Sequence, residues 1–119
     1  MKTWCIAVAA LLCVVAPNSW AHAMLDRASP PVGSSVATAP SEVRLRFTQK
    51  IEPAFSTIRV VDRDGRQVDK QDKQVDSSDR TVLRVSLPPL PNGVYRVIWR
   101  ALSADTHVTQ GDYTFEVGK

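Results

Sequence analysis

The 119-residue chain is poor in the residues that cross-link small proteins. It has two cysteines, Cys5 and Cys13, and both lie in an apolar N-terminal stretch. Once that stretch is removed, no disulfide and no thiolate ligand remain, so the fold must rest on a hydrophobic core. Aromatic residues make up only 7% of the chain, and no cluster of Lys and Arg alternates with them. We therefore expect no nucleic-acid binding.

Long apolar runs are also missing. The longest, Cys5–Ala16, has about twelve residues, whereas a membrane-spanning helix needs roughly 20. This run follows Met1-Lys2 and precedes a turn-forming segment, Pro17–Ala21, which is the order of a secretory signal peptide. We therefore expect residues 1–21 to be cleaved and residues 22–119 to form one soluble domain without a membrane anchor.

The cleavage position decides which residue begins the exported chain. Signal peptidases prefer small residues at positions −3 and −1. Cleavage after Ala21 uses Ser19 and Ala21 and leaves His22 first. Cleavage after Ala23 uses Ala21 and Ala23 and leaves Met24 first. The cleavage pattern alone does not separate these two possibilities.

The exported part is predicted to consist of strands separated by turns. Glu42–Phe47 alternates strictly between polar and apolar residues, the period of a strand with one face in water. Val94–Leu102 alternates in the same way and places Trp99 on its apolar face, as the expected core aromatic. Further strands are predicted at Ser56–Asp62, Thr81–Leu87 and Tyr113–Val117, with short or irregular ones at Met24–Ala28 and Gln67–Lys70.

About seven short strands with frequent turn signals over roughly 100 residues are typical of an all-β, Ig-like Greek-key β-sandwich. Here it would lack a disulfide. No segment keeps a helical period over three turns. The polar, charged stretch Asp69–Arg80 predicts a long exposed loop or a weak edge hairpin.

The exported part has two histidines, His22 and His107. A histidine at a free N-terminus offers its α-amine and its imidazole Nδ1 to one metal ion, and both groups lose protons readily when a metal competes. His107 ends the sequence Asp105-Thr106-His107, and residues two apart in an extended segment point to the same side. The carboxylate and the imidazole can therefore converge on one ion. The alternatives are an incidental terminal residue and an exposed histidine beside a turn aspartate.

The segment Tyr95–Phe115 has a distinctive order of residues. Tyr-Arg-Val-x-Trp-Arg leads into Ser-x-Asp-x-His, followed by a glycine and Tyr-Thr-Phe. Near the N-terminus, His22-Ala23-Met24-Leu25 is followed by Ser29-Pro30-Pro31. Together these motifs resemble the signature of the CopC family of periplasmic copper proteins, over essentially all of residues 22–119.

The resemblance implies that one Cu(II) per chain is bound by the amine and imidazole of His22, by Asp105 and by His107. It favours cleavage before His22, because cleavage before Met24 would delete a ligand. Nitrogen donors with one carboxylate oxygen in a near-square arrangement suit Cu(II), and zinc, which prefers a tetrahedron, is the second choice. The family further implies a periplasmic carrier or buffer in copper resistance, homeostasis or transport, a monomer, and an inner-membrane transporter of the CopD type as partner.

Two features depart from the family pattern. Some members bind Cu(I) through a methionine-rich loop, but the exported part has one methionine, Met24, and Asp62–Arg80 has none. We therefore expect no Cu(I) site, since Cu(I) prefers soft thioether ligands. Several members carry a glutamate after a Phe-Ser pair, where this chain has Gln49 after Phe47-Thr48. The resemblance therefore carries no charged or proton-accepting role over to Gln49.

A copper carrier is favoured over two other functions. Copper monooxygenases also hold copper with an N-terminal histidine, but Asp105 as a ligand would stabilise Cu(II) and occupy a position that oxygen needs. Tyr95, Trp99 and Phe115 are assigned to the core, which leaves no flat aromatic surface for a polysaccharide. A metal-free Ig-like interaction module leaves both histidine features unexplained. We therefore expect no catalytic residues and no enzymatic activity.

Overall fold

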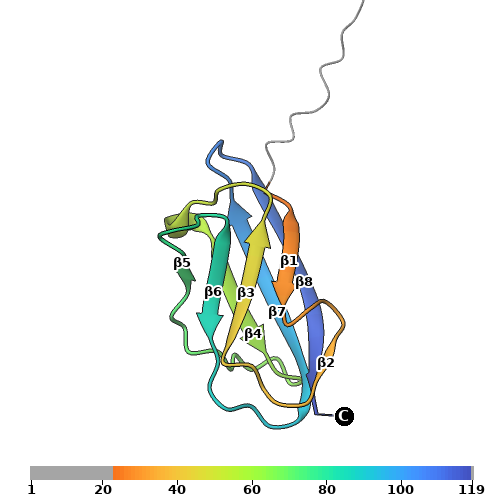
Figure 1. The fold of residues 1–119 in the computed structure, drawn as a ribbon. Helices are drawn as coiled ribbons and strands as arrows, with labels where there is room; N and C mark the ends of the chain where they lie inside the picture. Colours follow the sequence, from red (N-terminus) through yellow and green to blue (C-terminus); the bar gives the residue numbers. More distant parts are fainter. Residues whose placement is uncertain (1–22, 119) are drawn as a thin grey trace, which may run out of the picture.

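The computed structural model describes residues 23–118, which form a β-sandwich of two facing four-stranded sheets (Figure 1). The strand order is β1-β3-β6-β5 in one sheet and β2-β8-β7-β4 in the other. A short 3-10 helix, η1 (Pro53–Phe55), lies between β3 and β4. The strands are β1 (Leu25–Ser29), β2 (Ser35–Val36), β3 (Glu42–Phe47), β4 (Thr57–Val61), β5 (Gln74–Val75), β6 (Val82–Ser86), β7 (Gly93–Leu102) and β8 (Val108–Val117).

The predicted all-β Ig-like sandwich is confirmed, and the regularly alternating strands were located best. Strand β3 has the predicted bounds, Glu42–Phe47, and β7 begins one residue before the predicted Val94–Leu102. None of the described residues forms a helix long and apolar enough to cross a membrane.

The weakly patterned segments were predicted less well. The predicted strand Gln67–Lys70 is wrong: Gln67 forms only an isolated bridge with Val61. Asp69 instead turns inward, where its Oδ2 accepts a hydrogen bond from the backbone N–H of Val60 at 2.8 Å. The stretch Asp69–Arg80 does contain an edge strand, β5, which pairs with β6. The two-residue strand β2 was not predicted.

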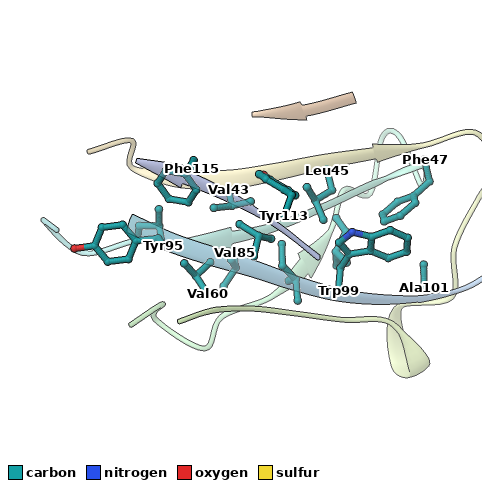
Figure 2. Close-up of a cluster of buried hydrophobic side chains, with 14 of the residues drawn as sticks. Val43, Leu45, Phe47, Val60, Val85, Tyr95, Trp99, Ala101, Tyr113 and Phe115 are labelled. Carbon is teal, nitrogen blue, oxygen red and sulfur yellow. The ribbon is translucent and has the colours of Figure 1, made fainter. Parts of the chain in front are cut away.

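The core lies between the sheets and follows the predicted alternation of β7. Tyr95, Val97, Trp99 and Ala101 all point inward and are at most 8% exposed. Figure 2 shows these side chains packing against residues of the facing sheet. The partners from β3 and β6 include Val43, Leu45, Phe47 and Val85.

Trp99 explains a glycine in the opposite strand. The indole meets Phe47 edge-on, with ring centroids 5.1 Å apart, and Gly111 lies directly across from Trp99 on β8. A Cβ at Gly111 would lie 2.7 Å from Cζ2 of Trp99, closer than two nonbonded carbons approach. Any larger residue at position 111 would therefore displace the indole.

Tyr113 supplies a test of this core. Burial raises the pKa of Tyr113 well above its ordinary value, and its hydroxyl has no hydrogen-bond partner within residues 23–118. An unpaired buried hydroxyl costs about 1–3 kcal/mol. We therefore expect Tyr113→Phe to raise the free energy of unfolding by about 1 kcal/mol in urea denaturation. A clear loss of stability would show that the hydroxyl is paired after all.

Candidate metal centre

The loop between β7 and β8, residues 103–107, is held by a buried serine at its base. Ser103 is 1% exposed, and its backbone N–H donates to the carbonyl of His107 at 2.9 Å. Its Oγ accepts from the backbone N–H of His107 at 3.3 Å and donates to Oδ1 of Asp105. These bonds fix the aspartate and the histidine relative to one another, although both lie outside the strands.

The side chains of Asp105 and His107 meet at the surface. Nδ1 of His107 lies 3.3 Å from Oδ2 of Asp105, and the two side chains are 45% and 40% exposed. Metal ions bind imidazole nitrogens and carboxylate oxygens at about 2 Å, so two atoms 3.3 Å apart are close enough to share one ion. The pair therefore fits the predicted ligand set, and its exposure leaves an ion free to enter and depart.

The route by which these residues converge differs from the prediction. An extended Asp105–His107 segment was expected, but the intervening Thr106 adopts a left-handed conformation with φ of 74°. Its N–H donates to the carbonyl of Ser103 at 2.9 Å, which closes a turn. The turn brings the two side chains closer than a strand would, because residues two apart in a strand are separated by about 7 Å.

Hydrogen bonding lowers the pKa of Asp105 below its ordinary value. The bond from Ser103 is the largest cause, and the bond from His107 and its positive charge, when protonated, add to it. Both stabilise the carboxylate over the neutral acid. Asp105 therefore remains an anionic oxygen donor in mildly acidic solution.

The start of the described chain is fastened beside this loop. Ala23 is fully buried, and its carbonyl accepts a hydrogen bond from Oγ1 of Thr109 at 2.6 Å. Met24 donates its N–H to Oγ1 of Thr48 at 3.0 Å, and the N–H of Thr48 donates to the carbonyl of Met24 at 2.8 Å. Ala23 therefore sits next to the first residues of β8, two positions beyond His107.

A third segment, residues 48–52, supports the same loop. Ala104 donates its N–H to the carbonyl of Lys50 at 3.2 Å, and Glu52 donates its N–H to the carbonyl of Leu102 at 2.8 Å. Ile51 forms a bridge with Ser103 between these two bonds. The half-buried Gln49 belongs to this segment.

The structure brings together two of the three predicted ligands. His22 lies outside the described residues. Residues 23–118 contain no group of three or more His, Cys, Asp or Glu side chains that could hold a metal ion. Asp105 and His107 lie together at one end of the sandwich, the end at which β1 begins and the β7–β8 loop projects (Figure 1).

Comparison with known proteins decides the family. The sequence model of the CopC domain matches residues 25–118. This chain belongs to the CopC family. The CopC domain is 32% identical over 110 residues to copper resistance protein C of Escherichia coli, covering 87% of this chain and 86% of that protein. It is 32% identical over 117 residues to the copper transport protein CutJ of Bacillus subtilis, covering 98% of this chain but only 22% of CutJ.

Solved structures agree with this assignment. CopC from Methylosinus trichosporium OB3b superposes with a TM-score of 0.76 at 36% identity, covering 81% of this chain and 93% of that one. PcoC of Escherichia coli, described as a methionine-rich copper resistance protein, has a TM-score of 0.69 at 32% identity, covering 82% and 99%. This CopC domain differs from PcoC in methionine content, since its sequence has only Met1 and Met24.

Sequence reasoning missed the residues that position the site. The sequence shows Ser103 only as part of a motif, and its role in holding Asp105 and His107 becomes visible in the structure. A serine two residues before an aspartate can signal such a local hydrogen bond. Thr48 and Thr109, which hold residues 23 and 24, had no signal, because their partners are distant in sequence.

Proposed function

We propose that this CopC domain binds one Cu(II) per chain and carries or buffers it in the periplasm. The ligands would be the α-amine and imidazole of His22, the carboxylate of Asp105 and the imidazole of His107. The pair formed by Asp105 and His107, 3.3 Å apart at an exposed loop, is the observation that supports this most directly. Membership of a family whose relatives are named for copper resistance supports the choice of metal.

The burial of Ala23 supports an exported chain that begins at His22. Ala23 is 0% exposed and belongs to the hydrophobic core. Cleavage before Met24 would remove this core residue and the acceptor of the Thr109 hydroxyl. Cleavage before His22 keeps both. We therefore propose residues 1–21 as the signal peptide and residues 22–119 as the mature domain.

Chain connectivity supports His22 as the third ligand. Consecutive Cα atoms lie 3.8 Å apart, so the chain connection keeps His22 close to the buried Ala23. The carbonyl of Ala23 accepts a hydrogen bond from Thr109, which is two residues beyond His107, so the Cα atoms of Thr109 and His107 are at most about 7.6 Å apart. The amine and imidazole of a residue tethered there can reach an ion held by His107 and Asp105.

The exposed position of the pair favours a carrier over a structural metal site. The loop is already held by Ser103 and by its bonds to residues 50–52, so the fold does not depend on an ion. Nitrogen donors with one carboxylate favour Cu(II), whereas Cu(I) prefers thioethers, of which the mature chain would have one, Met24. We propose no second site for Cu(I) and no catalytic activity.

We further propose that the domain acts as a monomer and passes copper to an inner-membrane transporter of the CopD type. The match to part of CutJ, named a copper transport protein, supports a role in delivery. Arginines on the outer faces of both sheets would repel one another in an interface between two copies. They are Arg27, Arg44, Arg46 and Arg84 on one face and Arg59, Arg96 and Arg100 on the other.

The proposal predicts a defined pH dependence. Because the pKa of Asp105 is lowered, its carboxylate stays charged as the pH falls to 5. Imidazoles and α-amines, with ordinary pKa values of about 6.5 and 8, take up protons first and release the metal. Cu(II) affinity, measured by chelator competition between pH 5 and 8, should therefore fall steeply below about pH 6. Affinity that stays constant to pH 5 would indicate a site made of carboxylates instead.

A further inference from the structure

The outer face of the β1-β3-β6-β5 sheet carries arginines in opposed positions. Arg27 of β1 lies directly across from Arg46 of β3, and Arg44 of β3 lies across from Arg84 of β6. Like charges directly opposite one another on neighbouring strands destabilise a sheet. Two such pairs side by side therefore cost stability, unless a negative charge is bound between them.

The same face is hollowed where β1 and β3 meet. The hollow has a volume of about 240 Å³. Val82, which lies across from Arg46 and is 2% exposed, contributes apolar surface to its floor. Its other lining residues are Arg27, Ala28, Ser29, Arg44, Arg46 and Asp79.

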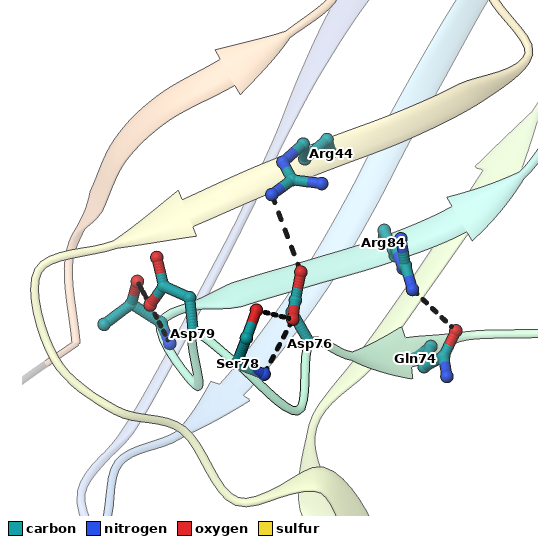
Figure 3. A network of polar contacts seen from close by, with 7 residues as sticks. Arg44, Gln74, Asp76, Ser78, Asp79 and Arg84 are labelled. Atoms are coloured by element: carbon teal, nitrogen blue, oxygen red, sulfur yellow. Dashed lines mark hydrogen bonds and ion pairs between the residues drawn. The ribbon is translucent and has the colours of Figure 1, made fainter.

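The two acidic residues beside the hollow, Asp76 and Asp79, are already engaged, whereas three arginines line it. Asp76 lies 3.7 Å from Arg44, and its Oδ1 accepts from the N–H and the hydroxyl of Ser78 (Figure 3). Asp79 is bound by the N–H and the hydroxyl of Thr81, which lower its pKa, and the charge of Arg46 adds a smaller effect.

The other arginines of this face have no ion-pair partner among the described residues. Arg84 donates to Oε1 of Gln74 at 3.0 Å, which satisfies a donor without neutralising its charge (Figure 3). In the part of the chain that the structure describes, Arg27 and Arg46 form no ion pair. The hollow therefore combines unpaired donors, an excess of positive charge and room for a small group.

We propose that this hollow binds a phosphate group. Guanidinium groups present N–H donors in a planar fork that matches the oxygens of phosphate, and each such charge-assisted pair is stronger than a neutral hydrogen bond. Arg27 and Arg46 are the principal ligands, with Arg44 beside them. The hydroxyl of Ser29 can donate to the same group. The phosphate is either free or carried on a lipid headgroup, because the shared chemistry of the two sources fits this hollow.

Titration of the mature protein with inorganic phosphate tests the proposal. The side-chain Nε–Hε signals of arginine, followed by NMR at low and constant ionic strength, should shift saturably for Arg27 and Arg46. The double variant Arg27→Gln/Arg46→Gln should bind phosphate about tenfold or more weakly. Its Tm should equal or exceed that of the native protein, since the like-charge pair of Arg27 and Arg46 is gone.

A matched variant on the other sheet controls for net charge. Arg59→Gln/Arg100→Gln removes the same charge from the outer face of β4 and β7 and should bind phosphate like the native protein. Uniform, unsaturable shifts of all arginines, or equal weakening of phosphate binding by both double variants, would overturn the proposal.

Sedimentation with phosphatidylglycerol vesicles then identifies the source of the phosphate. If the native protein and the Arg59/Arg100 variant sediment but the Arg27/Arg46 variant does not, the phosphate is on a lipid headgroup. If none of them sediments while the native protein still binds inorganic phosphate, the phosphate is free.

Discussion

A protein with one additional residue before His22 should lose most of its affinity for Cu(II). The added residue converts the α-amine into an amide, whose nitrogen has no basic lone pair and binds copper only after losing a far less acidic proton. The chelate ring is then broken, although the imidazole of His22 is unchanged. Acetylation of the His22 amine should have the same effect. Competition with a chelator at pH 7 measures the loss.

The folding of the extended protein can be checked separately from its metal binding. Ala23, Thr48 and Thr109 keep their hydrogen bonds in it, so its Tm without metal should match that of the native protein. A side-chain site made only of Asp105 and His107 would tolerate the added residue. Equal Cu(II) affinity in the two forms would therefore remove the terminal amine from the proposed ligand set.

Replacing His107 with alanine should weaken Cu(II) binding by orders of magnitude and leave the fold nearly unchanged. The side chain of His107 is 45% exposed on a loop, and the bonds from Ser103 to residue 107 use backbone atoms that the substitution keeps. Chelator competition measures the binding, and thermal denaturation without metal measures the fold.

Trp99→Ala is the matched comparison, because it should destabilise the fold and affect Cu(II) binding little. The indole is 8% exposed and lies in the core between Phe47 and Gly111. Truncating a buried aromatic of this kind costs about 3–5 kcal/mol of unfolding free energy. If His107→Ala lowers the Tm of the metal-free protein as much as Trp99→Ala does, His107 is a structural residue and not a ligand.

The fold could be predicted where one physical constraint dominates the sequence. A strand with one buried and one wet face must alternate, and the alternation of Glu42–Phe47 located β3 without error. Strand β8 begins at Val108, five residues before the predicted Tyr113. The residues in the first half of β8 are exposed or half-buried, so they show no buried alternation. This half includes Gly111, which is explained by Trp99 on the neighbouring strand and not by the local sequence pattern.

Segments whose order depends on distant partners could not be predicted. Gln74–Val75 is a strand only because β6 offers it an edge, and Ser35–Val36 only because it pairs in parallel with the end of β8. Asp69 looks like a loop residue in a charged stretch. It is buried because the backbone N–H groups of Val60 and Gln71 donate to its carboxylate.

The residues of the candidate site could be predicted from the sequence, but the local structure that brings them together could not. The nearness of Asp105 and His107 follows from their spacing, although a turn at Thr106 and not a strand produces it. The burial of Ala23, on which the proposed cleavage position rests, has no sequence signature. Its burial depends on β8 and on Thr109, which follows it by 86 positions.

The intact mass of the exported protein, recorded under native conditions with and without added copper, tests the central claim most directly. One spectrum reports both the N-terminal residue and the number of ions retained. The account predicts a chain that begins at His22 and holds one copper. A chain that begins at Met24 and still retains copper, or a chain that begins at His22 and retains none or two, would contradict it.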